Sequence, residues 1–156
     1  MAVAPLVKTQ WLRQQMLHGV KNLRILDGSW HLPSTKRDAK KEYEEKRIPE
    51  ALFFDIDECC DKSSPYEHMI PSVEEFGKYV KKLGISNDTH VVVYDRNENF
   101  GLFSAPRVWW TFRVFGHNLV SVVNGGLPKW CSDGFPTESG PLKELPEGNL
   151  RLNYQY

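Results

Sequence analysis

Short apolar runs along this chain alternate with amphipathic stretches that carry their own start and stop signals. Four runs each lead into a polar residue and predict strands, at 23–27, 51–54, 90–95 and 119–123. The run at 90–95 is unbroken, as expected of a strand buried on both faces. Strands that alternate with helices predict right-handed βαβ crossovers, so the fold class is α/β with a mostly parallel sheet covered on both faces.

The stretches between these runs predict helices with recognisable ends. Ser72 and Glu75 form a capping box at the start of the clearest helix, and Gly84 stops it. Thr9 and Ser104 stand where N-caps are expected, and the remaining helical stretches cover 39–47 and 127–133. Leu6, Trp11, Leu12, Met16 and Val20 are expected to share one face of the first helix.

The end of the chain differs in composition from the rest. From Pro136 onward, proline and glycine recur and apolar residues are few. We therefore expect one domain over 1–138 and a tail or interdomain linker over 139–156.

Polar side chains gather where the expected strands end, and ligands of open parallel sheets bind at those ends. Asp57 and His68 lie 11 residues apart across one such loop. A carboxylate paired with an imidazole fixes which ring nitrogen is free for acid–base work. The alternative is an ordinary polar surface loop. Trp30, after the first strand, is either a pocket wall or a side chain packed on the core.

Charge and cysteine content narrow the function classes. Basic and acidic residues balance at 20 each, so nothing predicts a nucleic-acid or membrane-surface partner. The three cysteines, Cys59, Cys60 and Cys131, are too few and too poorly spaced for a secreted disulfide scaffold. Residues 1–26 hold four basic side chains and no acid, which suits either a mitochondrial targeting segment or an ordinary first helix. The expected location is the mitochondrial matrix, the cytoplasm or both.

Motifs for several common cofactors are absent. The sequence has no phosphate-binding P-loop, no dinucleotide-binding glycine fingerprint, no G-x-S-x-G elbow and no zinc-ligand spacing. We expect no cofactor and no metal.

Three segments nevertheless resemble one family. "RIPEALFFDID" and "VVNGGLPKWCSDGFP" are similar to the two rhodanese signatures, with "VVVYDRNENFG" between them. The chain most resembles the N-terminal, non-catalytic domain of two-domain thiosulfate and mercaptopyruvate sulfurtransferases. The resemblance implies a rhodanese-like, mostly parallel five-stranded sheet with helices on both faces.

The resemblance also implies where the chemistry lies. In the catalytic domain of that family, a cysteine heads the loop after the third strand motif and carries sulfur as a persulfide. Here Asp95 stands in its place, followed by Arg96, Asn97, Glu98, Asn99, Phe100 and Gly101. This degenerate loop cannot carry sulfur, so activity is expected to need a second rhodanese domain, a small-molecule sulfur donor, and cyanide or a thiol such as thioredoxin as acceptor.

The same resemblance gives Asp57 and His68 a role. In mercaptopyruvate sulfurtransferases the N-terminal domain contributes an aspartate and a histidine across the domain interface, whereas the thiosulfate-preferring relatives generally lack that histidine. The expectation is therefore the mercaptopyruvate type, with Trp30 as a binding residue. Three alternatives stay open: half of a thiosulfate sulfurtransferase, an inactive scaffold or regulator, and an enzyme that uses one of the chain's own cysteines.

Overall fold

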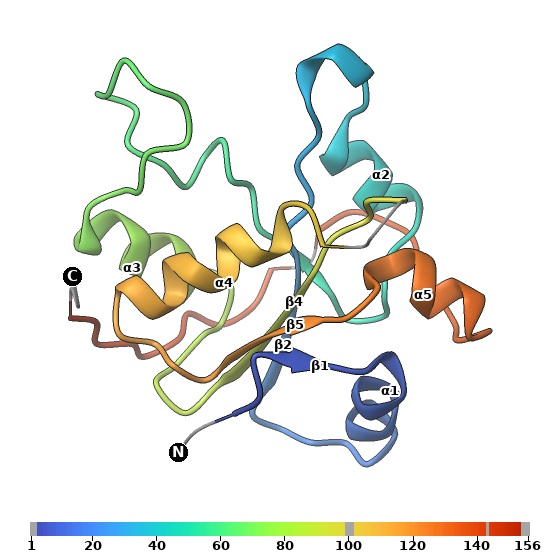
Figure 1. The fold of residues 1–156 in the computed structure, drawn as a ribbon. Helices are drawn as coiled ribbons and strands as arrows, with labels where there is room; N and C mark the ends of the chain where they lie inside the picture. The colour runs from blue at the N-terminus through green and yellow to red at the C-terminus, as the bar shows by residue number, and fades with distance from the viewer. Residues whose placement is uncertain (1–2, 99–101, 143, 154–156) are drawn as a thin grey trace.

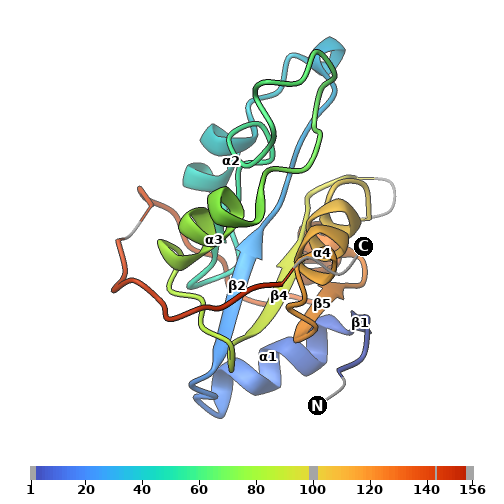
Figure 2. The ribbon, with the colours of Figure 1, turned by 90° about the vertical axis from the view of Figure 1, so that its left-hand side faces the viewer.

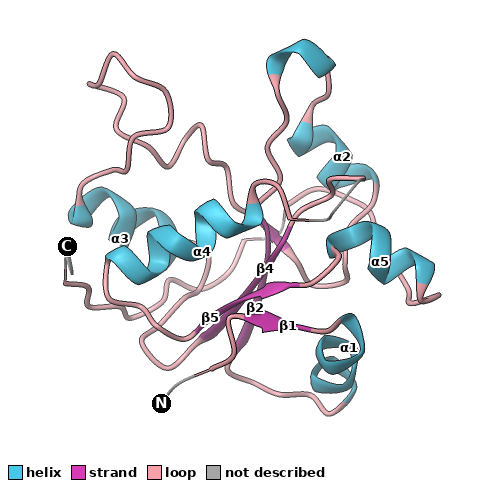
Figure 3. Ribbon diagram, in the orientation of Figure 1, coloured by secondary structure: helices cyan, strands magenta, loops and turns pink. Residues whose placement is uncertain are grey.

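Five parallel strands form the central sheet of the computed structural model, which describes residues 3–98, 102–142 and 144–153. In chain order the strands are β1 (Leu6–Val7), β2 (Leu23–Asp27), β3 (Leu52–Phe53), β4 (His90–Tyr94) and β5 (Val120–Val123). Their order in the sheet is β1-β5-β4-β2-β3, and each neighbouring pair runs parallel. The sheet lies in the middle of the ribbon, with helices around it (Figures 1 and 3). The predicted α/β fold with a mostly parallel sheet is confirmed.

Helices cover both faces of this sheet. The helices are α1 (Thr9–Leu17), α2 (Ala39–Glu45), α3 (Val73–Lys81), α4 (Ala105–Val114) and α5 (Gly126–Ser132), with a short 3₁₀ helix, η1, at Pro33–Thr35. The α3 and α4 helices lie on one face, and α1, α2 and α5 lie on the other (Figure 1). Within the described residues, none of these helices is both long enough and apolar enough to cross a membrane.

Alternate strand residues supply the two cores. Leu26 and Val93 are paired in register and face α3 and α4, whereas Ile25 and Val92 face the other layer. Because successive side chains of a strand point to opposite faces, strands buried on both faces are apolar throughout. Each fully buried aliphatic side chain contributes about 1.5–3 kcal/mol relative to exposure.

Three local features differ from the sequence expectation. Leu6 pairs with Val122 as part of edge strand β1, rather than lying on the face of α1. Thr9 is the first residue of α1, not its cap, and its buried hydroxyl donates to Asp133. Ser104 occupies the N-cap position of α4, but its hydroxyl donates to the carbonyl oxygen of Gly28 at 2.7 Å. For Thr9 and Ser104, the hydroxyl makes a hydrogen bond to a residue far away in the sequence and therefore does not cap its own helix.

The expected start of α3 is confirmed, and residues within 144–153 pack on the domain. The Ser72 hydroxyl accepts the N–H of Glu75 at 3.2 Å, so it caps α3. Beyond the domain end expected at 138, Leu150 is buried in the core on the α3–α4 face, and the N–H of Gly148 donates to Lys81. A role of 139–156 as an interdomain linker remains a prediction.

Long loops leave the carboxyl ends of β2 and β3 and project from the same end of the molecule (Figures 1 and 2). They carry the residues that the sequence singled out.

Candidate functional site

Asp95 directly follows β4 and is buried, with 1% of its surface exposed. Its Oδ2 atom accepts hydrogen bonds from the backbone N–H groups of Phe103 at 2.7 Å, Ser104 at 2.8 Å and Ala105 at 2.8 Å. Its Oδ1 atom accepts the N–H of Asn97 at 3.0 Å. Because α4 begins at Ala105, this carboxylate caps the helix.

This arrangement is an anion-binding cradle filled by the protein's own side chain. Backbone N–H groups at a helix N-terminus would stabilise a thiolate or a bound anion equally well. A carboxylate in that position keeps the loop's hydrogen bonds and offers no sulfur nucleophile. Glu98 is exposed, and Asn99, Phe100 and Gly101 lie outside the described residues.

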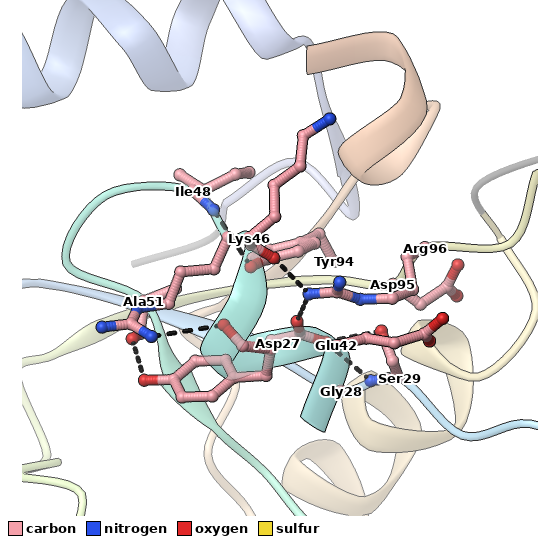
Figure 4. A network of polar contacts seen from close by, with 12 residues as sticks. Asp27, Gly28, Ser29, Glu42, Lys46, Ile48, Ala51, Tyr94, Asp95 and Arg96 are labelled. Carbon is pink, nitrogen blue, oxygen red and sulfur yellow. Dashed lines mark hydrogen bonds and ion pairs between the residues drawn. The ribbon is translucent and has the colours of Figure 1, made fainter. Parts of the chain in front are cut away.

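A buried ion pair ties this loop to the neighbouring strand (Figure 4). Arg96 donates through Nη2 to Asp27 at the end of β2, and also to the carbonyl oxygen of Lys46 at 2.9 Å. Asp27 accepts the N–H of Ser29 at 3.0 Å and its hydroxyl at 2.5 Å. Burial disfavours the charged form of Arg96, but the adjacent Asp27 carboxylate more than offsets this and raises the pKa of Arg96. The pair therefore fixes the loop's position, which sequence reasoning did not foresee.

Asp57 and His68 meet, a contact that their spacing allowed. The Nε2 atom of His68 lies 2.7 Å from Oδ1 of Asp57. Asp57 comes shortly after β3 with a side chain 63% exposed, and His68 is better covered at 24%. An imidazole held through Nε2 presents Nδ1 as its free nitrogen.

Besides Asp57, two neighbours hold His68 in place. The Trp30 ring meets the imidazole edge to face, with centroids 4.7 Å apart, and Phe103 stacks on Trp30 at 6.3 Å. Arg107, in the first turn of α4, donates to the carbonyl oxygen of His68. The backbone of His68 is left-handed, with φ of 59°, a conformation that a non-glycine residue keeps only when its surroundings impose it.

Trp30, Asp57, His68 and the exposed Tyr66 line one surface cavity of about 430 Å³. Trp30 therefore lies where a binding residue would, although its role remains a prediction. Arg107 was missed by sequence reasoning. The available signal was a basic residue in the first turn of a helix that begins beside the carboxyl ends of the strands.

The chain's thiols are poorly suited to catalysis. Burial raises the pKa of Cys59 to about 12. Burial also raises the pKa of Cys60, whose thiol donates to the carbonyl oxygen of Asp57 at 3.1 Å. A thiol acts as a nucleophile only as the thiolate, so these environments disfavour an enzyme based on Cys59 or Cys60. Cys131 lies in α5, partly buried against the core on the α1, α2 and α5 face of the sheet.

The part of the chain that the structure describes contains no group of three or more His, Cys, Asp or Glu side chains placed to hold a metal ion.

Comparison with known proteins agrees with this geometry. The model of the rhodanese-like domain family matches residues 37–133. Over 143 residues, or 90% of the chain, the sequence is 55% identical to thiosulfate sulfurtransferase of Rattus norvegicus and 48% identical to 3-mercaptopyruvate sulfurtransferase of Homo sapiens. Each alignment covers 48% of the relative, so the chain spans about half the length of the curated relatives it matches.

A solved structure shows the same fold. The chain superimposes on SseA of Escherichia coli, described as a 3-mercaptopyruvate sulfotransferase with the rhodanese fold, with a TM-score of 0.85 and 37% identity. That match covers 99% of this chain and 56% of the other. The family match and the shared fold agree with each other. The chain belongs to the family of rhodanese-like domains.

Proposed function

We propose that this chain is the N-terminal half of a two-domain sulfurtransferase that takes sulfur from 3-mercaptopyruvate. The observation that carries the proposal is the Asp57–His68 pair, held at 2.7 Å against Trp30 at the carboxyl ends of the strands. The family match and the named relatives support sulfur transfer as the reaction class.

The two domains would have different roles in the reaction. Asp95 fills the cradle where a nucleophile would stand, so the attacking cysteine belongs to a second rhodanese domain. Its thiolate attacks the substrate sulfur, and the carbon–sulfur bond breaks to leave a cysteine persulfide and the enolate of pyruvate. The enolate takes up a proton, and the outer sulfur then passes to cyanide or a thiol, with thioredoxin as a candidate acceptor.

His68 would manage the proton in this step. Asp57 holds Nε2, so Nδ1 is the atom that can take the proton of the attacking cysteine thiol and give it to the enolate as the carbon–sulfur bond breaks, while the transferred sulfur keeps its own proton. Arg107 and Trp30 restrict the ring's position, which favours proton transfer along one direction.

Exposed apolar side chains support a partner domain over this face. Tyr66, Met69 and Phe103 are all exposed beside His68 or Trp30. The chain's coverage of about half of each relative leaves room for such a domain. Location in the mitochondrial matrix or the cytoplasm is part of the same proposal and rests on the basic, acid-free composition of residues 1–26.

Turnover of two donors by the intact two-domain protein tests the proposal. We expect His68→Ala to lower kcat/KM for 3-mercaptopyruvate by about 100-fold or more, the scale of general acid–base catalysis, and to change thiosulfate turnover far less. An equal loss with both donors, or no loss, would count against the assignment. His18→Ala removes an exposed histidine at the end of α1, outside the cavity around His68, and serves as the control.

A thiosulfate sulfurtransferase is the second candidate, because identity is higher to relatives of that name, at 55% against 48%. It predicts a higher kcat/KM for thiosulfate than for 3-mercaptopyruvate and no dependence on His68. An inactive scaffold would turn over neither donor even with its second domain present.

A further inference from the structure

A second cavity, of about 420 Å³, lies at the edge of the sheet. It shares no lining residue with the cavity around His68. The short strand β3 pairs only with Leu26 and Asp27, so it does not extend along the first three residues of β2. The end of α1, the end of α2, Glu138 and Leu145 enclose the space that remains.

Two arginines in the cavity wall have hydrogen-bond donors without acceptors. Arg47 is 2% exposed, and its Nη1 donates to the carbonyl oxygens of Tyr43 and Gly140, but its buried Nε has no hydrogen-bond partner. Arg24 donates through Nη2 to Gly84 at 3.1 Å, and its buried Nε also has no partner. Native proteins rarely leave buried donors unsatisfied, so two such donors at one cavity call for an acceptor there.

The cavity's own acids do not supply that acceptor. Oε1 of Glu138 lies 3.8 Å from Nε of Arg47, beyond hydrogen-bond distance, and instead accepts the N–H of Glu50. The charged residues of the wall are Lys21, Arg24 and Arg47 against Glu50 and Glu138, which leaves one net positive charge. A singly charged anion matches this balance better than a dianion such as phosphate.

The uncharged part of the wall is apolar apart from Tyr43. Its apolar side chains are those of Met16, Val20, Leu23, Ile25, Leu52 and Leu145. Polar and apolar surface thus share the lining about equally, and the volume lies within the range of about 300–1,000 Å³ that is usual for small-molecule pockets.

We propose that this cavity binds a small amphipathic organic anion, a carboxylate or sulfonate with a hydrocarbon or aromatic body. The anionic head would accept from Arg24 and Arg47, and the body would lie on the apolar wall. The site is separate from the sulfur chemistry and stands whether or not the proposed function does.

A ligand bound in this cavity would also affect the segment that contains Glu138 and Gly140. Arg47 pairs with Glu138 through the backbone and holds Gly140, so it anchors the segment that closes the cavity. A ligand that binds the folded state alone stabilises it by mass action.

Fluorescence titration of the 156-residue chain tests the site with a matched pair of probes. The charged probe is 8-anilinonaphthalene-1-sulfonate, and the neutral probe is N-phenyl-1-naphthylamine, which has the same ring system without the sulfonate. We expect saturable one-to-one binding of the sulfonate, displacement by octanoate, and affinity for the neutral probe weaker by about tenfold or more, as charge-assisted hydrogen bonds imply.

Two arginine variants locate the site. Arg24→Gln should weaken sulfonate binding by about tenfold, whereas Arg13→Gln, on α1 but outside the cavity wall, should change it less than about twofold. The neutral-probe comparison needs no variant, so a folding defect in Arg24→Gln would leave that comparison decisive. Equal affinity for the two probes, an Arg24→Gln titration that matches the unchanged chain, or no saturation would overturn the proposal.

Discussion

Replacing Asp95 with alanine removes the carboxylate that holds the loop after β4. Three N–H groups at the start of α4 and one in the loop lose their acceptor. Phe103 is exposed, but Ser104 and Ala105 are buried, so water cannot replace the acceptor fully. The change therefore combines a lost helix cap with unsatisfied buried donors.

The magnitude follows from those bonds. A hydrogen bond to a charged group contributes about 1.5–3 kcal/mol, and the loss of an N-cap side chain alone costs about 0.5–2 kcal/mol. The four bonds share one carboxylate and are not additive, so we expect Asp95→Ala to lower the free energy of unfolding by about 3–5 kcal/mol. Against a typical total of about 5–15 kcal/mol, that is a large fraction. Asp95→Asn keeps one acceptor oxygen and should lose about half as much.

Urea unfolding followed by tryptophan fluorescence measures this loss. The matched control is Asp88→Ala, an exposed acid in the turn before β4, which should change stability by less than about 0.5 kcal/mol. A loss below about 1 kcal/mol for Asp95→Ala would show that the carboxylate does not hold the loop. The interpretation of Asp95 as a structural replacement for a nucleophile would then fail.

Three further measurements probe other parts of the fold. Burial lowers the pKa of His90 and His117, so protonation of these side chains favours the unfolded chain. The stability that they contribute should be full above the ordinary histidine pKa of about 6.5 and should fall as the pH drops below it. Urea midpoints measured between pH 7 and 5 would show this fall, and a flat profile would contradict it. Cys59, with a pKa of about 12, should resist iodoacetamide at pH 8 in the folded chain and react in urea, and equal rates in the two states would contradict its burial. In Gly28→Ala the new Cβ would lie 2.9 Å from a methyl of Val108, and the crowding should cost about 1–3 kcal/mol by urea unfolding; an unchanged midpoint would show that α4 can shift.

Sequence patterns predicted the parts of this fold that depend on local residues. The strands β2, β4 and β5 lie where short apolar runs predicted them. Edge strand β1 has only two residues, Leu6 and Val7, which is too short for any periodicity to show. Its pairing with β5 depends on tertiary contacts, so the resemblance to a known family, not the pattern, gave the fifth strand.

The candidate site also combines contacts within one loop, which the sequence suggests, with contacts between distant elements, which it does not. Asp57 and His68 lie on one loop, so their spacing allowed a contact, and the resemblance to a known family favoured it. The contacts of Trp30 and Arg107 with His68 join different elements, and no pattern in the sequence encodes them. Ser104 illustrates the opposite case: the local rule named it as the cap, but Asp95 performs that role from the end of β4.

The central proposal is that this domain shapes a sulfur-transfer site without ever carrying the sulfur. Mass spectrometry of peptides from the intact two-domain protein, after a single turnover with 3-mercaptopyruvate and no acceptor, tests it most directly. We expect one added sulfur atom on a cysteine of the second domain, and Cys59, Cys60 and Cys131 unmodified. A persulfide on any of these three cysteines, formed at the rate of turnover, would contradict the proposal.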